Sequence, residues 1–137
     1  MYKILLVEDE RETANFVKQA LELEDMEVET AYDGQEGLDL FRANEYDLLL
    51  LDYEMPRMNG EDLVRQVRKE NPYIDIIVYT NYKDFNLAKK MMNMGVNGYV
   101  NKGPESDLQE LVDMVKQKLE PLDDEDISLL IRNTDEI

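Results

Sequence analysis

The residues of this chain that could do chemistry follow short apolar runs. They are three carboxylates, a hydroxyl and an amine, at Glu8, Asp9, Asp52, Thr80 and Lys102. If the apolar runs are parallel strands of one sheet, their carboxyl ends lie along the same edge and bring these groups together. Three carboxylates at short range repel one another unless a cation lies among them. A ligand set made only of oxygen suits a hard divalent cation, so the pattern predicts an Mg²⁺ site.

Asp52 is the candidate nucleophile of this predicted site. A carboxylate can attack phosphorus when Mg²⁺ and an ammonium group neutralise the phosphoryl oxygens. Lys102 would supply the ammonium group, and Thr80 would donate its hydroxyl to a phosphoryl oxygen. Each residue alone is more often an ordinary polar residue at a strand end. A nucleophile, metal ligands and a cation at one edge together favour phosphoryl chemistry.

The composition excludes several other chemistries. The 137 residues include no histidine and no cysteine, which excludes Ser-His and Cys-His catalysis, thiolate nucleophiles, disulfides and the usual zinc sites. Fifteen Lys and Arg against 32 Asp and Glu give a net charge of −17. This charge repels nucleic-acid phosphates and anionic lipids, so we expect no direct contact with nucleic acid or membrane. Because the N-terminal apolar run is too short for a secretory signal, we expect a cytoplasmic protein.

Five short apolar runs alternate with longer amphipathic stretches. The runs predict strands at 4–7, 27–31, 48–51, 74–79 and 98–101. The stretches predict helices at 10–23, from 34 beyond 41, from 60 to 71, at 83–94 and at 104–119. Leucine favours helices, so the strand at 48–51 is predicted from its short length and from Met55-Pro56 just beyond it. Five β–α units predict an α/β fold with a doubly wound, flavodoxin-like parallel sheet and helices on both faces.

Four segments carry a resemblance to a known family. They are ILLVEDE at 4–10, LLLLDYEMPRMNG at 48–60, IIVYT at 76–80 and GVNGYVNK at 95–102. In this order and spacing the chain resembles a CheY-like receiver domain of the two-component response-regulator family. The resemblance covers residues 1–119 as the receiver domain and implies five strands in the order 2-1-3-4-5 with five helices.

The resemblance also implies roles for the acidic residues. Asp52 is similar to the phosphoacceptor of the family. Asp9 is similar to the acid that binds Mg²⁺ directly, and Glu8 to the acid that acts mainly through water. The backbone carbonyl of Glu54 would be a further ligand of the Mg²⁺ ion.

The remaining implied roles concern the switch. Thr80 resembles the hydroxyl that moves toward the phosphoryl group, Lys102 its counter-charge, and Tyr99 the aromatic that rotates with the switch. The surface formed by 83–94, 98–101 and 104–119 would then change for a downstream effector domain or protein. The phosphoryl donor would be a histidine kinase or a phosphotransfer protein, because a chain without histidine cannot supply phosphohistidine.

Three positions around the predicted site are expected to set the lifetime of the phosphorylated form. Asn81 stands where most of the family has a small residue, Tyr82 follows it, and Glu54 lies two residues past the acceptor. All three flank the path of a hydrolytic water. We therefore expect slow autodephosphorylation.

Other functions remain as alternatives. The chain could be a phosphorelay intermediate or the truncated receiver of a multidomain regulator. A distant alternative is an Mg²⁺-dependent aspartyl phosphatase, but those enzymes place D-x-D at the first strand, where this chain has Glu8-Asp9. We expect a signalling receiver that catalyses only its own phosphorylation and dephosphorylation, rather than an enzyme with separate substrates.

Features outside the predicted site carry separate expectations. Residues 120–137 carry seven acids and one arginine after the helix expected to end near 119, and they could be a linker, a frayed tail or one short docked helix. A homodimer could form through this tail or through the surface of 83–94, 98–101 and 104–119. Tyr79 is expected to pack in the core, and the basic residues Arg65, Arg68 and Lys69 are expected to be solvated.

Overall fold

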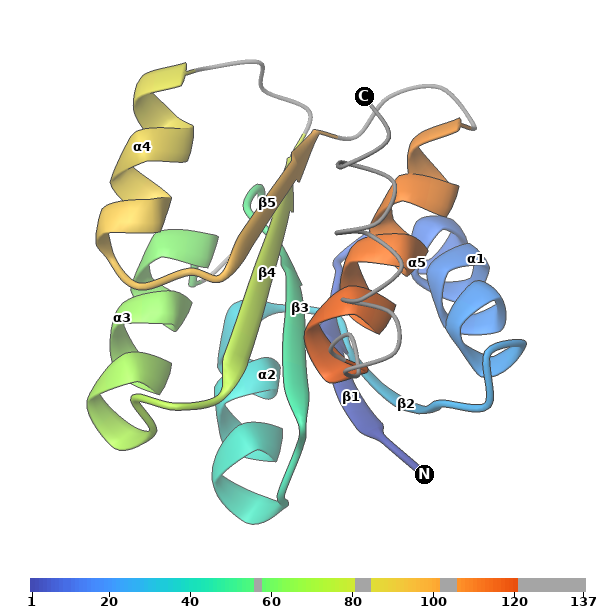
Figure 1. Ribbon diagram of the computed structural model, residues 1–137. Helices are drawn as coiled ribbons and strands as arrows, with labels where there is room; N and C mark the ends of the chain where they lie inside the picture. Colours follow the sequence, from blue (N-terminus) through green and yellow to red (C-terminus); the bar gives the residue numbers. More distant parts are fainter. Residues whose placement is uncertain (56–57, 81–84, 102–105, 121–137) are drawn as a thin grey trace.

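Five strands alternate with five helices in the part of the chain that the structure describes. The computed structural model describes residues 1–55, 58–80, 85–101 and 106–120 (Figure 1). The strands are β1 (Lys3–Val7), β2 (Glu27–Ala31), β3 (Leu48–Asp52), β4 (Asp75–Thr80) and β5 (Gly98–Asn101). The helices are α1 (Arg11–Glu22), α2 (Gly34–Ala43), α3 (Gly60–Glu70), α4 (Phe85–Asn93) and α5 (Ser106–Leu119).

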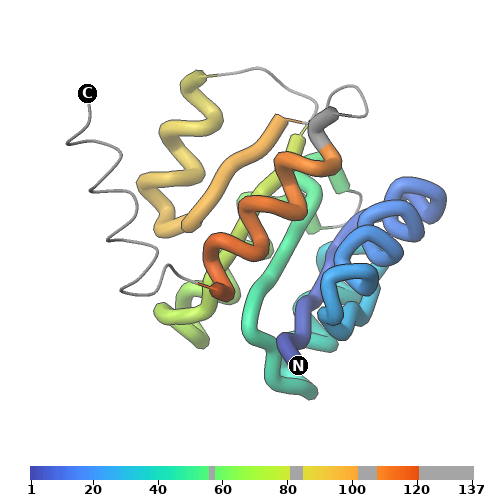
Figure 2. Tube along the Cα trace, turned by 45° about the vertical axis from the view of Figure 1, so that its right-hand side comes forward, coloured from blue at the N-terminus to red at the C-terminus, as the bar shows by residue number. Residues whose placement is uncertain are grey.

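The strands form one parallel sheet in the order β2-β1-β3-β4-β5. Helices α1 and α5 cover one face, and α2, α3 and α4 cover the other (Figures 1 and 2). The strand order reverses between β1 and β3, because β1 pairs with β2 on one side and with β3 on the other. The predicted doubly wound α/β fold with five helices is confirmed. Ligands of such sheets bind at this switch point, beyond the carboxyl ends of the strands.

The central strands β1 and β3 are apolar because helices cover both of their faces. The four leucines of β3 are fully buried, and they alternate between two cores. Leu48 and Leu50 pack on the α1/α5 face, and Leu49 and Leu51 pack on the α2–α4 face. Burial on both faces outweighs the modest helix propensity of leucine. The predicted strand at 48–51 is therefore confirmed.

The helix that begins after Thr80 divides its methionines between core and surface. Met91 is fully buried in the α2–α4 core, whereas Met92 is 49% exposed. The predicted start of this helix at Lys83 lies outside the described residues, which resume at Phe85. Strand β4 begins and ends one residue later than predicted, so Thr80 is its last residue rather than the residue after it.

Arg68 corrects the expectation of a solvated basic face. Its guanidinium donates to the backbone carbonyls of Gly95 (2.7 and 3.0 Å), Ile74 (2.7 Å) and Asn71 (3.2 Å), and to the Asn97 side-chain oxygen (2.8 Å). The planar fork of an arginine matches several carbonyls at once. Arg68 thereby ties the end of α3 to the start of β4 and to the loop that follows α4. Only Arg65 and Lys69 remain exposed as predicted.

Helix α5 ends at Leu119, and the receiver boundary expected near this residue stays a prediction. The acidic tail predicted for 120–137 lies outside the described residues, apart from Glu120. Among the helices of the described residues, none is both long and apolar enough to cross a membrane.

Replacing Arg68 by methionine, which keeps most of the apolar stem, should lower the free energy of unfolding by about 2 kcal/mol. The reason is that the partly buried hydrogen bonds to the carbonyls of Ile74 and Asn71 and to the Asn97 side chain lose a charged donor. Urea denaturation would measure this effect. Arg65→Met is the matched control on the same helix. Arg65 is exposed and forms surface ion pairs with Glu61 and Asp62, so its loss should cost under about 0.5 kcal/mol. Equal losses in the two variants would contradict the role given to Arg68.

Candidate functional site

Glu8, Asp52 and Tyr79 lie in one row across the carboxyl end of the sheet. Asp52 pairs in register with Tyr79, and Glu8 follows Val7, which pairs with Leu51, the neighbour of Asp52. Side chains alternate between the faces of a strand. The three residues therefore share the face covered by α1 and α5, and all three are at most 2% exposed.

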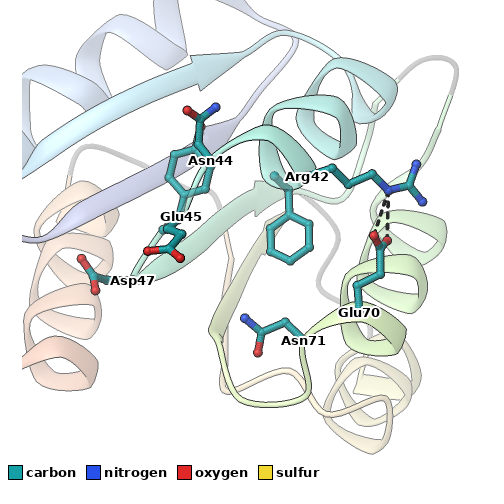
Figure 3. Close-up of a pocket in the computed structure, with 8 residues that line it drawn as sticks. Arg42, Asn44, Glu45, Asp47, Glu70 and Asn71 are labelled. Carbon is teal, nitrogen blue, oxygen red and sulfur yellow. Dashed lines mark hydrogen bonds and ion pairs between the residues drawn. The ribbon is translucent and has the colours of Figure 1, made fainter.

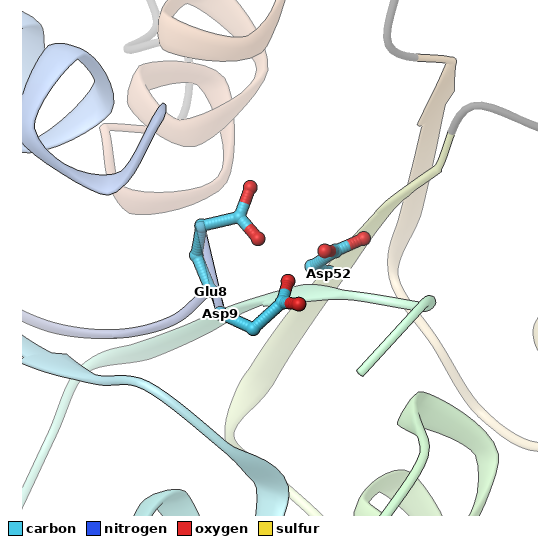
Figure 4. A group of neighbouring side chains, drawn as sticks. All are labelled: Glu8, Asp9 and Asp52. Atoms are coloured by element: carbon cyan, nitrogen blue, oxygen red, sulfur yellow. The ribbon is translucent and has the colours of Figure 1, made fainter. Parts of the chain in front are cut away.

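The carboxylates of Glu8, Asp9 and Asp52 converge (Figure 4). Each contributes an oxygen, and the three oxygens lie within 4.8 Å of one another. Glu8 and Asp52 are buried, whereas Asp9 is exposed. Three charges this close repel, and burial of two of them weakens the screening by water. The group could therefore hold a metal ion, as the sequence predicted, and the exposed side leaves room for water ligands, which Mg²⁺ usually keeps.

Backbone hydrogen bonds fix the segment after Asp52. The N–H of Tyr53 donates to the Tyr79 carbonyl at 3.0 Å, and the N–H of Gly60 donates to the Tyr53 carbonyl at 3.1 Å. A Cβ on Gly60 would lie 2.8 Å from the Tyr53 Cα, so only glycine allows this approach. The N–H of Glu54 donates to an Asp52 side-chain oxygen at 3.2 Å. The carboxylate of Asp52 is thus held by its own loop.

The Glu54 side chain reaches the predicted switch residue. Thr80 is fully buried, and its hydroxyl donates to the Oε1 atom of Glu54. Sequence reasoning gave Glu54 only a backbone ligand role and a place near the water path, and missed this contact. A glutamate two residues beyond a strand-end aspartate is a weak signal for it, since the contact depends on how the loop turns.

Tyr79 is the second residue that sequence reasoning underrated. Its ring packs in the α1/α5 core as expected, but it stands beside the acidic group. Burial raises the pKa of Tyr79 well above 10, and the negative charges of Glu8 and Asp52 add to this effect. The phenol therefore stays neutral next to the carboxylates. Its place one residue before Thr80, in a strand next to the one that ends in Asp52, was the available signal.

The remaining predicted site residues divide into two groups. Tyr99 is half-buried on β5, packed against the α2–α4 core, a position from which an aromatic ring could exchange between core and surface. Its rotation stays a prediction. Lys102, Asn81 and Tyr82 lie outside the described residues.

A cavity of about 640 Å³ lies elsewhere, at the amino ends of the strands (Figure 3). It is lined by Phe41 and Arg42 at the end of α2, by residues 44–47 of the α2–β3 connection, and by Glu70 and Asn71 at the end of α3. Arg42 closes one side by pairing with Glu70 at 2.9 Å. The acidic group at the carboxyl ends of the strands shares no residue with this cavity.

Comparison with known proteins agrees with this geometry. The family model described as "Response regulator receiver domain" matches residues 4–116. The response regulator ArlR of Staphylococcus saprophyticus is 37% identical over 119 residues, which are 87% of this chain and 53% of the relative. ArlR of Staphylococcus aureus is 34% identical over 127 residues, or 57% of its length. The chain thus spans about half the length of these curated relatives.

Solved structures show the same likeness. A CheY-like receiver domain protein from Methanospirillum hungatei is 30% identical with a TM-score of 0.80, over 87% of this chain and 94% of that one. The response regulator TrrA from Thermotoga maritima, solved in complex with Mg²⁺-BeF, is 33% identical with a TM-score of 0.77, over 86% and 99% of the two chains.

The raised pKa of Tyr79 predicts a loss of stability in alkali. The unfolded chain releases this proton near pH 10, whereas the folded protein keeps it. Above pH 10 the unfolded state therefore binds fewer protons, and the free energy of unfolding falls as the pH rises, by up to about 1.4 kcal/mol per pH unit for this group. This pH dependence would be measured by denaturing the wild type and Tyr79→Phe between about pH 9 and 12, a range that includes the ordinary tyrosine pKa of about 10.

The Tyr79→Phe variant should lose stability less steeply over this range, although Tyr46, whose pKa burial raises to about 12, still contributes. Tyr73→Phe is the matched control, because Tyr73 is 90% exposed and should leave the wild-type slope unchanged. Parallel curves for Tyr79→Phe and the wild type would contradict the assignment.

Proposed function

This chain belongs to the response regulator receiver domain family, and from that premise we propose that Asp52 accepts a phosphoryl group from phosphohistidine. The donor is a histidine kinase or a phosphotransfer protein, because the chain has no histidine of its own. The reaction takes place in the cytoplasm, where ATP is the source of the phosphoryl group for such kinases. The observation that carries the proposal is the convergence of Glu8 and Asp9 on the buried carboxylate of Asp52.

Each residue of the site has a distinct part in this transfer. An Asp52 oxygen forms a bond to phosphorus while the bond between phosphorus and the donor imidazole breaks, and the imidazole leaves with the electron pair. Thr80 donates its hydroxyl to a phosphoryl oxygen, and Lys102 supplies a positive charge beside it. The backbone N–H of Glu54, which bonds Asp52 at 3.2 Å, holds the nucleophile in place.

Glu8, Asp9 and Asp52, with the backbone carbonyl of Glu54, would hold the Mg²⁺ ion. The all-oxygen donor set, with its mutual repulsion at 4.8 Å or less, fits this ion. When bound, Mg²⁺ neutralises charge on the carboxylates and on the phosphoryl oxygens. A chain that acts in this way catalyses only its own phosphorylation and dephosphorylation. A separate aspartyl phosphatase activity is a distant alternative.

The output of the phosphorylated form would pass through the surface of α4, β5 and α5. Thr80 ends β4, the strand next to β5, and Tyr99 lies on β5 against the same core as α4. Movement of Thr80 toward the phosphoryl group would be accompanied by rotation of Tyr99. The altered surface would bind an effector domain or protein, or a second copy of the chain. Residues 120–137 are a second candidate for self-association.

Two related roles suit the same chemistry. The chain could serve as a phosphorelay intermediate, or as the receiver of a longer regulator. The second role is supported by the curated ArlR relatives, of which the matched regions are 53% and 57%. In either role the −17 charge opposes direct contact of this domain with nucleic acid.

The central test is labelling with acetyl phosphate. The wild type should gain one phosphoryl group in Mg²⁺, detected by mass spectrometry of the intact protein, and chelation of Mg²⁺ should prevent the gain. Asp52→Asn, which keeps the size of the side chain, should remain unlabelled, while Asp113→Asn on the exposed face of α5 should be labelled like the wild type. Equal labelling of Asp52→Asn and the wild type would refute the assignment.

The predicted slow autodephosphorylation has its own test. If Asn81 and Tyr82 restrict the hydrolytic water, the Asn81→Ala, Tyr82→Ala variant should lose its phosphoryl group about tenfold faster, which corresponds to about 1.4 kcal/mol in the barrier. The decay of the labelled protein after removal of acetyl phosphate would measure this rate. A half-life of seconds that is the same in both proteins would sink the idea.

A further inference from the structure

Glu54 contacts both the candidate phosphoacceptor and the candidate switch residue. Its backbone N–H donates to Asp52 at 3.2 Å, and its side-chain oxygen accepts the hydrogen bond of the Thr80 hydroxyl. Asp52 and Thr80 are 1% and 0% exposed. Glu54 is itself partly buried, so water competes only weakly for this hydrogen bond.

A threonine hydroxyl carries a single proton and can donate it to one acceptor at a time. In the structure the Thr80 hydroxyl donates its hydrogen bond to a carboxylate oxygen of Glu54. In the proposed phosphorylated form a phosphoryl oxygen on Asp52 would need the same proton. The two hydrogen bonds of Thr80 are therefore mutually exclusive.

We propose that Glu54 is a positioning residue of the switch: its carboxylate holds Thr80 in the unphosphorylated arrangement, and phosphorylation of Asp52 must take the Thr80 hydroxyl away from it. The inference rests on the proposed function, because it requires a phosphoryl group at Asp52. It goes further by naming what the switch hydroxyl is bonded to before phosphorylation. No covalent step is added, since only one hydrogen bond is exchanged for another.

Charge explains how the exchange is driven. A phosphoryl group adds up to about two negative charges, so it competes with the single charge of Glu54 as an acceptor and also repels the Glu54 carboxylate. Both effects favour release of Thr80 once Asp52 is modified. Before modification, the Glu54–Thr80 bond reduces the fraction of molecules ready to bind a phosphoryl group. The apparent affinity for a phosphoryl analogue falls by that fraction.

The test is a double-mutant cycle with beryllofluoride as the phosphoryl analogue in saturating Mg²⁺. Its binding to the wild type, Glu54→Ala, Thr80→Val and the double variant would be measured by fluorine NMR titration. Glu54→Ala should bind the analogue about tenfold more tightly than the wild type, a gain of about 1.4 kcal/mol. Glu54→Gln, which removes the charge but keeps a neutral acceptor, should fall between the two.

The Thr80→Val background separates the two ways in which Glu54 could act. Simple charge repulsion between Glu54 and the analogue persists without the hydroxyl, whereas competition for the hydroxyl disappears. The gain from Glu54→Ala should therefore shrink to about threefold or less in the Thr80→Val background. An equal gain in both backgrounds would overturn the inference, because Glu54 would then act by charge alone.

Two controls keep the outcomes distinct. Asp52→Asn should not bind the analogue. If it binds as well as the wild type, the proposed function fails, whatever the cycle gives. Thermal unfolding of each variant checks that it is folded. If Glu54→Ala is unfolded, Glu54→Gln replaces it in the cycle, since its side chain has nearly the same size. An unchanged affinity in folded Glu54→Gln would then also overturn the inference.

Discussion

Repulsion among three carboxylates at the carboxyl ends of β1 and β3 is the constraint on which the rest of this structure depends. Glu8 and Asp52 are buried, and their oxygens lie with that of Asp9 within 4.8 Å of one another. At an effective dielectric constant of about 20, each such pair costs on the order of 3 kcal/mol. The fully buried apolar residues of β1 and β3 offset this cost, because each central strand packs against helices on both faces. The stability of the core thus allows a site with unfavourable charge repulsion, and a bound cation or a change in charge at the site can reduce that repulsion.

The sequence predicted the fold and the acidic group for the same physical reason. Strands buried on both faces must be apolar along their length, so their ends are visible as the first polar residues after each run. Parallel pairing then places those ends together without knowledge of any loop, which is why Glu8, Asp9 and Asp52 could be grouped in advance. The period of the helix expected at 83–94 does not show which of its methionines is buried. Met91 is inside and Met92 is 49% exposed, because the phase of a short helix depends on its packing.

The residues that sequence reasoning missed act through contacts that loops create. Arg68 donates hydrogen bonds to the backbone carbonyls of Gly95, Ile74 and Asn71. Because every residue has a backbone carbonyl, the sequence does not show which ones accept these bonds. The Glu54–Thr80 hydrogen bond depends on the turn after β3, which the approach of Gly60 to Tyr53 fixes. Tyr79 was correctly predicted to pack in the core, but its ring is apolar and its hydroxyl is polar. A periodicity argument places the ring and says nothing of what the hydroxyl meets.

The two ends of β4 differ in a way that suits a switch. At its start, the carbonyl of Ile74 and the N–H of Ile76 are bonded by Arg68 and Asn97, and Arg68 also holds the carbonyl of Gly95 beyond α4. These bonds involve no group that the proposed phosphorylation changes. At its end, Thr80 is held by Glu54, whose bond must compete with any new acceptor on Asp52. Because a hydrogen bond to a carboxylate can be exchanged for one to a phosphoryl group at small net cost, the strand can respond at one end while the other stays fixed. A change at Thr80 would then reach α4 from its N-terminal side, with the segment after α4 held in place.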